Sequence, residues 1–419
     1  MTTSDAHRAI EAVWRIESAK VIAGLTRMTG DVGLAEDLAQ DALVAALERW
    51  PESGVPDNPG AWLMATAKHR AIDQLRRRTL VGRKHEELAR ELSAKPSGPD
   101  LDAALDDHVG DDMLRLIFTT CHPVLSTEAR VALTLRLLGG LTTGEIARAF
   151  LVPEATIAQR IVRAKRTLRE ARVPFEVPPP AELGARLSSV LDVLYLIFNE
   201  GYSATAGDEW VRPALCDDAL RLGRILAELA PADPEVHGLV ALMEIQASRL
   251  KARVGPAGEP ILLLDQDRAR WDQLLVRRGL AALERAEQLA GALGPFALQG
   301  AIAACHARAR TAEETDWTRI TALYDALAQL TQSPVVELNR AVAYSMAFGP
   351  ATGLEIVDTL TSDPALESYH LLPSVRADFL AKLGRFGEAR AELERAASLT
   401  RNTRERALLI ERAKGLKES

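Results

Sequence analysis

The sequence predicts an all-α protein, and three observations support this fold class. Ala, Leu, Arg and Glu dominate a composition that is 47% hydrophobic but only 5% aromatic, which favours helices over sheets. The alternation of Val, Ile, Thr and Tyr that is typical of strands is nearly absent, and apolar residues recur instead at helical spacing. At 419 residues, the chain is long enough for about three domains, each with its own core.

Residues 7–50 predict two or three helices. The last of these is predicted to begin at Asp31 or Gly33 and to end at Pro51. Its apolar side carries Leu34, Leu38, Ala42, Ala45 and Ala46, and its polar side carries Glu36, Asp37, Gln40 and Asp41.

A basic helix is predicted at residues 62–78, after a loop rich in Pro and Gly at residues 51–60. It is apolar at Leu63, Ala67, Ala71 and Leu75. Its exposed face carries Lys68, His69, Arg70, Arg76, Arg77 and Arg78.

The sign of the charge reverses in the linker at residues 86–112, which contains many acidic residues and, as basic residues, Arg90 and Lys95. The segment KPSGPD in its middle marks a flexible joint. Such a tether would be repelled by DNA and would suit a positively charged channel on a partner. From charge alone, a merely solvated linker explains the segment equally well.

A helix, a tight turn and a second, basic helix are predicted over residues 141–172. Thr142 and Glu145 have the spacing of a capping box, which satisfies two amide donors at the start of the first helix. Pro153 ends that helix and is tolerated at the beginning of the next. In the second helix, a buried stripe is predicted at Ile157, Ile161, Ala164 and Leu168.

The cations of this second helix lie off the buried stripe. They can contact phosphates, and three residues of its N-terminal half, Thr156, Gln159 and Arg160, can reach base edges in a major groove. A basic helix alone is more typical of a solvated face, but the capping box, the small residue Ala147, the proline turn and the one-sided charge together favour DNA binding. The other cations of the helix are Arg163, Lys165, Arg166 and Arg169.

The C-terminal half is predicted to be helical after a semi-rigid proline hinge, PFEVPPPAEL. Residues 187–332 show no clear period. Residues 339–360 match a tetratricopeptide (TPR) helix pair at Phe348, Gly349 and Leu354. A second degenerate pair carries small and apolar residues at Ala377, Leu380, Leu383, Gly384, Ala389, Leu393 and Ala396.

The segment DQDRARWD most simply caps a helix. Asp265 and Asp267 are predicted to cap a helix that starts near Ala269, beside Arg268, Arg270 and Trp271; a docking site is the alternative. A catalytic role for the residues Asp265, Asp267, His237 and His306 is disfavoured. No paired carboxylates, nucleophile and base, or Gly-rich phosphate loop accompany them.

The cysteines argue against a disulfide framework or a zinc module. Cys121, Cys216 and Cys305 are odd in number, far apart and without CxxC spacing. A helix pair is predicted at residues 113–136, with its break at Cys121 and His122. These two residues resemble half of a metal site, but no second pair of ligands lies at a suitable spacing. No metal, cofactor or catalytic residue is therefore predicted.

The chain is predicted to be a cytoplasmic protein that contacts no membrane. Its N-terminus lacks the apolar core of a signal peptide, and no apolar run approaches the roughly 20 residues that span a bilayer. Val190–Phe198 predicts a buried helix instead. Although the net charge is −7, the basic residues cluster in two short helices, which is compatible with binding nucleic acid.

The ordered combination of DLAQDALVAALERW, AWLMATAKHRAIDQLRR, the acidic linker and LTTGEIARAFLVPEATIAQRIVRAKRTLR resembles bacterial sigma factors of the extracytoplasmic-function (ECF) group. The remaining half, with RLSSVLDVLYLIFNEGYSAT and LLLDQDRARWDQ, resembles the ECF subgroup with a C-terminal extension of TPR-like helices. The resemblance implies two small helical domains and a helical repeat domain. The chain would then consist of sigma region 2 (1–85), the acidic linker (86–112), sigma region 4 with a helix-turn-helix (113–173), the hinge (174–186) and the extension (187–419).

The resemblance also implies partners and residue roles. The protein would bind the beta and beta-prime subunits of bacterial core RNA polymerase, with the acidic linker in a cationic channel, and would direct transcription from promoter DNA. Docking residues would be Asp37, Leu38, Gln40 and Asp41. The −10 element would be bound by Trp62, Lys68, His69, Arg70, Arg76, Arg77 and Arg78, and the −35 element by Thr156, Gln159, Arg160, Arg163, Lys165 and Arg166.

Two points stay open in the sequence. Many family members have Arg-Asn where this chain has Lys68-His69, so the base preference at the −10 element is not carried over. The extension offers a concave surface for a protein or peptide ligand and is predicted to regulate in cis. The rival hypothesis is a stand-alone helix-turn-helix regulator with a TPR-like sensor domain, which leaves the docking helix and the linker unexplained.

Overall fold

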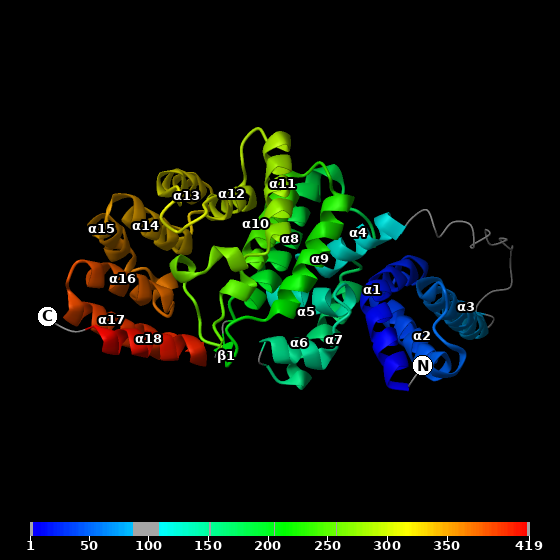
Figure 1. Cartoon of the computed structure of the whole chain (residues 1–419). Coiled ribbons are helices and arrows are strands. Elements are labelled where there is room, and N and C mark those ends of the chain that lie inside the picture. Colours follow the sequence, from blue (N-terminus) through cyan, green and yellow to red (C-terminus); the bar gives the residue numbers. More distant parts are fainter. Residues whose placement is uncertain (1–2, 87–108, 151, 205, 257, 417–419) are drawn as a thin grey trace. The chain divides into compact units, whose positions relative to one another are not determined.

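The computed structural model describes residues 3–86, 109–150, 152–204, 206–256 and 258–416. The chain divides into two compact units, Met1–Val193 and Leu194–Ser419. Helices form nearly all of the regular structure (Figure 1), so the all-α prediction is confirmed. In the described residues, the strands are two short segments, β1 (Ala206–Gly207) and β2 (Arg401–Asn402), which pair in parallel.

The first unit begins with three helices, α1 (Thr3–Thr29), α2 (Val32–Ser53) and α3 (Pro59–Glu86). Asp31 is the N-cap of α2, because its Oδ1 accepts hydrogen bonds from the amides of Gly33 and Leu34 at 2.8 and 3.1 Å. The predicted start of this helix is therefore confirmed.

The predicted end of α2 at Pro51 is wrong. The helix continues to Ser53 and stops at Gly54, whose φ of 82° favours glycine. The Gly54 amide still donates to the Trp50 carbonyl at 2.9 Å. A proline this close to the helix end removes only one amide donor, so the last turn can form around it.

Four further helices follow in the first unit: α4 (Val109–Thr120), α5 (Thr127–Leu137), α6 (Thr143–Phe150) and α7 (Glu154–Glu170). The predicted break between α4 and α5 is confirmed. Ser126 is the N-cap of α5, with its Oγ accepting from the Ala129 amide at 3.3 Å.

The helix-turn-helix formed by α6 and α7 has the predicted local structure. The Thr142 amide donates to Glu145 Oε2 at 2.8 Å, and the Glu145 amide donates to Thr142 Oγ1 at 3.2 Å, which is a reciprocal capping box. Pro153 is the N-cap of α7. The buried residues of α7 are Ile157, Ile161, Ala164 and Leu168, as predicted.

The division between the two units falls within α8 (Pro180–Tyr202). Its first half belongs to the first unit: Arg186 Nη2 donates to the Phe118 carbonyl at 2.9 Å, and Ser189 Oγ donates to the Cys121 carbonyl at 2.9 Å. The predicted buried segment Val190–Phe198 lies in this helix. Among the described residues, no helix is both long and apolar enough to cross a membrane.

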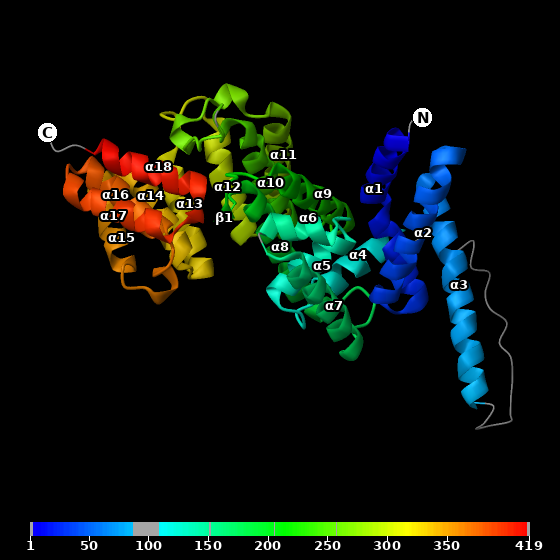
Figure 2. The ribbon, with the colours of Figure 1, turned by 90° about the horizontal axis from the view of Figure 1, so that it is seen from below.

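The second unit continues with ten α-helices in the described residues, several of which lie side by side in Figure 2. They are α9 (Pro213–Leu229), α10 (Pro234–Ser248), α11 (Gln273–Leu289), α12 (Pro295–Arg308), α13 (Trp317–Thr331), α14 (Pro334–Phe348), α15 (Pro350–Leu360), α16 (Leu371–Lys382), α17 (Phe386–Leu399) and α18 (Thr403–Gly415). A Cβ at Gly238 of α10 would lie 2.5 Å from the amide nitrogen of Ala297 in α12, so these helices meet closely at a glycine.

The two predicted TPR-like pairs are α14 with α15 and α16 with α17. Each turn contains a glycine with positive φ, Gly349 at 103° and Gly384 at 76°. The predicted apolar residues Ala377, Leu380, Ala389, Leu393 and Ala396 are buried. Two other residues of the pattern, Leu383 and Phe348, are instead 38% and 58% exposed.

The predicted helix start near Ala269 is wrong. Asp267 caps only a short 3-10 turn, η4 (Arg268–Arg270), by accepting from the Ala269 amide at 2.9 Å. The long helix α11 starts at Gln273, with Asp272 as its N-cap. Trp271, between the two, is buried, and the Asp272 side chain accepts hydrogen bonds from the amides of Leu274 and Leu275 at 2.9 and 3.2 Å.

Candidate nucleic-acid interface

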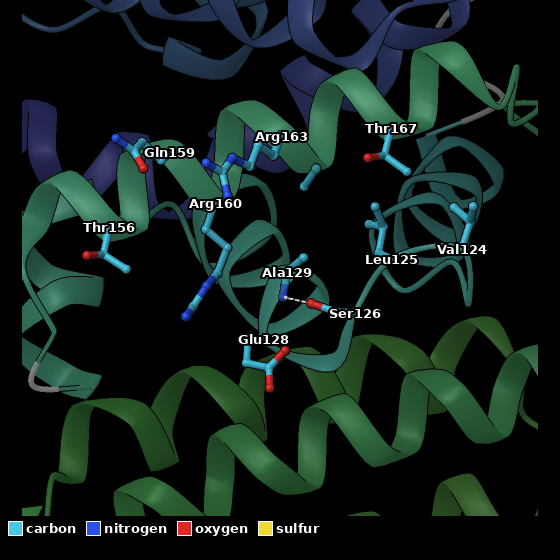
Figure 3. Close-up of a pocket in the computed structure, with 11 residues that line it drawn as sticks. Val124, Leu125, Ser126, Glu128, Ala129, Thr156, Gln159, Arg160, Arg163 and Thr167 are labelled. Carbon is cyan, nitrogen blue, oxygen red and sulfur yellow. Dashed lines mark hydrogen bonds between the residues drawn. The ribbon is translucent and has the colours of Figure 1, made fainter.

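The outward face of α7 carries most of the residues predicted to read DNA. Thr156, Gln159 and Arg163 are exposed and Arg160 is half-buried. Together with the segment 124–129 they line a pocket of about 460 Å³. Figure 3 shows Arg160 extending from α7 toward Glu128 at the start of α5.

The electrostatics of this face leave two cations available. Among the described residues, neither Arg160 nor Arg163 forms an ion pair, whereas Arg166 Nε lies 2.6 Å from Glu170 Oε1 at the exposed end of the helix. The Glu128 carboxyl has a pKa below its usual range, because its own backbone amide and the Ser126 hydroxyl stabilise the charged form, with Arg160 adding to the effect. The charged Glu128 carboxylate therefore lies in the same pocket as Arg160 and Arg163.

Lys165 does not share this face. It forms an ion pair with Glu36 of α2, and Arg169, one turn later, pairs with Asp31 at 2.9 Å. The prediction grouped Lys165 with the DNA-facing residues because only the buried stripe of α7 was visible in the sequence. The structure divides the polar side of α7 into an outward face and a face toward α2.

Glu36 is the residue that sequence analysis misplaced. It was expected on the polar, exposed side of α2, but it is only 3% exposed. Arg136 Nε of α5 and Gln40 Nε2 each lie 2.6 Å from its Oε1, and Lys165 of α7 completes the cluster. A buried carboxylate requires such partners, and the two charged ones, Arg136 and Lys165, come from helices far away in the sequence.

The four predicted docking residues lie on α2 but differ in exposure. Asp37 and Asp41 are exposed and Gln40 is half-buried. Leu38 is 2% exposed, so its contacts are with the core of its own domain. Asp41 Oδ2 lies 3.4 Å from Arg70 Nη1, which connects the docking helix to α3.

The predicted −10 residues that the structure describes lie near the beginning of α3. Trp62 packs edge-on against Trp50 with ring centroids 5.3 Å apart. His69 is exposed, and Lys68 and Arg70 are half-buried. The side chains of Arg76, Arg77 and Arg78 lie outside the described part, as do residues 87–108 of the acidic linker.

The three cysteines and His306 are buried, whereas His122 is half-buried. Cys121 Sγ is 3.4 Å from Thr134 Oγ1, and burial raises the pKa of its thiol. Within the described ranges, no group of three or more His, Cys, Asp or Glu residues is arranged to hold a metal ion.

Comparisons with family models assign three segments of the chain. The Sigma-70 region 2 model matches residues 16–80, and the Sigma-70, region 4 model matches residues 115–168. A family of unknown function, DUF6596, matches residues 186–287. The two sigma models cover α2, α3 and the helix-turn-helix.

Comparisons with whole proteins agree. An uncharacterized protein of Rhizobium meliloti (strain 1021) is 42% identical over 93% of this chain and 92% of its own length. The probable ECF RNA polymerase sigma factor SigI of Mycobacterium tuberculosis (strain CDC 1551 / Oshkosh) is 28% identical over 41% of this chain and 59% of its own length. No solved structure matches the chain.

A third relative shows the family. The ECF RNA polymerase sigma factor SigL of Mycobacterium tuberculosis (strain ATCC 35801 / TMC 107 / Erdman) is 32% identical over 34% of this chain, and the match covers 77% of that protein. The chain therefore belongs to the family of ECF RNA polymerase sigma factors.

Proposed function

We propose that this sigma factor binds bacterial core RNA polymerase through the beta and beta-prime subunits and directs initiation by reading the −35 element with α7 and the −10 element with α3. The observation that carries this proposal is the outward face of α7, where Arg160 and Arg163 line a pocket and form no salt bridge among the described residues. An exposed basic helix after a tight turn is the element that enters a major groove in helix-turn-helix proteins.

The residues of α7 proposed to contact bases and those proposed to contact phosphates differ in their position along the helix. Thr156, Gln159 and Arg160 lie near the N-terminal half of the helix, where side chains reach base edges. Arg163 and Arg166 lie farther along and contact phosphates, which supply affinity without sequence information. Lys165 joins the DNA contacts only after it separates from Glu36.

At the −10 element, we propose that α3 captures unpaired DNA. The basic face with Lys68, His69 and Arg70 holds the backbone, and Trp62 offers an aromatic surface for a base. Extruding a base costs on the order of a few kcal/mol, which binding in a protein pocket offsets. The protein needs no catalytic residue for this step, because the polymerase makes the new bonds. The exposed carboxylates Asp37 and Asp41 are the proposed docking contacts on the beta-prime subunit.

Replacing Arg160 with Ala is expected to relax base discrimination at one position of the −35 element. Loss of one base contact lowers affinity for the preferred sequence by about 1–3 kcal/mol, and other sequences should bind as before. Arg163→Ala should instead weaken binding to all sequences and reduce the slope of log K against log salt by about 0.9. Quantitative footprinting of the holoenzyme on single-base promoter variants measures both effects.

The control for both variants is Arg385→Ala at the N-cap of α17. Arg385 pairs with Glu388 at 2.7 Å in the second unit, so its removal changes the net charge equally without touching α7. If Arg160→Ala lowers binding to all sequences by the same factor, Arg160 contacts phosphate and its proposed role is wrong.

We also propose that the C-terminal extension regulates the sigma domains in cis, with a protein or peptide as its ligand. The observation that supports this is α8, which belongs to both units. Because Arg186 and Ser189 bond to the region 4 domain, a fair test keeps them. Run-off transcription by a shortened chain ending at Val193 should differ in yield from that of the full chain, and equal yields would exclude regulation in cis.

A further inference from the structure

Arg249, which follows α10, is a buried cation with no acidic neighbour. It is 5% exposed, and within the described residues its guanidinium forms neither an ion pair nor a hydrogen bond. Its Cζ lies 5.7 Å from the centre of the Tyr202 ring and 5.5 Å from that of Trp271. Aromatic faces attract a cation, but less strongly than water does, so burial leaves the charge of Arg249 poorly compensated.

Two further arginines share these rings. Arg253 Cζ lies 3.8 Å from the centre of the Tyr202 ring, and Arg268 Cζ lies 5.2 Å from that of Trp271. Arg268 is held in place because its Nη1 donates to the carbonyls of His306 and Ala309 at 2.7 and 2.8 Å. Burial lowers the pKa of Arg249, and the charges of Arg253 and Arg268 lower it further. The three cations repel one another unless an anion lies among them.

Unused hydrogen-bond donors gather around the same rings. The Nε atoms of Arg249 and Arg253 and the indole Nε1 atoms of Trp210 and Trp271 are all buried without a partner in the described part of the chain. Trp210 belongs to the cluster because Arg253 Cζ lies 5.4 Å from its ring centre. Buried donors are rarely left unbonded in native proteins, and an oxyanion offers only acceptors.

We propose that Arg249, Arg253, Trp210 and Trp271 form a binding site for a small oxyanion in the C-terminal extension. The recognised group is a phosphate or a carboxylate of a small molecule, held by the two guanidinium groups and the indole N–H donors, with Arg268 adding positive charge. The half-buried residues Tyr202, Trp210 and Arg253 form the open side of the cluster, from which the anion enters. Charge-assisted hydrogen bonds to buried guanidinium groups are among the strong ones in proteins.

The test is titration of the full chain with three probes: inorganic phosphate, pyrophosphate and citrate. Tryptophan fluorescence reports binding, because two of the six tryptophans line the site, and calorimetry confirms it. Sodium chloride at matched ionic strength removes the effect of salt, and low millimolar probe concentrations avoid general stabilisation by phosphate. Saturable binding of phosphate or pyrophosphate identifies a phosphate ligand, and saturable binding of citrate alone identifies a carboxylate ligand.

Three variants decide whether the binding occurs at this site. Arg249→Met should abolish the saturable signal and raise the melting temperature in probe-free buffer, because it removes a charge without a counter-ion. Arg253→Gln should weaken binding at least tenfold, and it decides the question if Arg249→Met does not fold. Arg277→Gln, on the exposed side of α11, removes the same charge and should bind like the unchanged chain.

The proposal is overturned if no probe gives a saturable signal, or if Arg249→Met and Arg253→Gln bind as tightly as Arg277→Gln. A lower melting temperature of Arg249→Met without probe binding to the unchanged chain would mean that the arginines and rings only stabilise the fold. Neither polymerase nor DNA is present in the experiment, so its outcome does not depend on the proposed function.

Discussion

Replacing Glu36 with Ala is expected to weaken the contact of α2 with α5 and α7 by about 3 kcal/mol. Removing one member of a buried ion pair typically costs about 3–5 kcal/mol, because the remaining charge is left unpaired. The low end applies here, because the side chains of Lys165 and Arg136 are still 17% and 21% exposed and can regain water. Hydrogen exchange of amides in α2 and α7 of the full chain should become faster.

The same variant is expected to bind core polymerase more tightly. The −10 and −35 elements are separated by roughly 25 base pairs, which is about 85 Å of B-DNA. On the proposed function, region 2 and region 4 bind elements that lie farther apart than the contacts of Glu36 with Arg136 and Lys165 allow, so we expect these contacts to break in the complex with polymerase and promoter. Polymerase that binds only the form in which α2 is separated from α5 and α7 must supply the free energy of that separation. The variant lowers this free energy, so its affinity for polymerase should rise by at most on the order of a hundredfold.

The matched control for Glu36 is Glu48→Ala, which removes an exposed carboxylate from the same helix. It should change neither hydrogen exchange nor polymerase affinity. If Glu36→Ala behaves like Glu48→Ala in both measurements, the Glu36 cluster does not hold the two domains together.

Acidification is expected to destabilise the second unit through His306. This residue is 7% exposed. Burial lowers its pKa to about 3, and the charges of Arg249 and Arg268 add to the effect. In the unfolded chain, His takes up a proton below a pKa of about 6.5, whereas the folded chain resists protonation until about pH 3. The stabilising contribution is therefore complete above pH 6.5 and is lost as the pH falls.

Between pH 7 and pH 5, this difference amounts to about 2 kcal/mol in the free energy of unfolding. Urea unfolding of the full chain at the two pH values measures it, and tryptophan fluorescence reports the second unit because Trp317 packs edge-on against His306 at 5.2 Å. In His306→Gln, this part of the pH dependence should be missing. Equal pH dependence in the variant and the unchanged chain would show that His306 takes up its proton in the folded state.

Elements with local signals were predicted well from the sequence. The capping box of Thr142 and Glu145 and the stripe of Ile157 and Ile161 depend on residues within one or two turns of each other. Their side chains find partners in the same helix or the next one, so spacing alone specifies the structure. The base and phosphate contacts assigned to residues of α7 remain predictions, which the experiments above test.

Features that depend on distant partners were not visible in the sequence. Glu36 was misplaced because Arg136 and Lys165 become its neighbours only in the folded unit. The start of α11 lies at the last Asp of the same segment, because Asp272 rather than Asp265 or Asp267 accepts hydrogen bonds from the first amides of that helix. The arginine and aromatic cluster around Arg249 joins α8, α10 and the segment before α11, and its members are unremarkable one at a time in the sequence.

Run-off transcription tests the central claim most directly. Purified bacterial core RNA polymerase is combined with the full chain, or with the shortened chain ending at Val193, on DNA from upstream of the gene for this protein. The account predicts a transcript of defined length with at least one of the two proteins and none with core polymerase alone. No transcript from either protein, together with stable DNA binding in the absence of polymerase, would contradict the account and favour a stand-alone regulator.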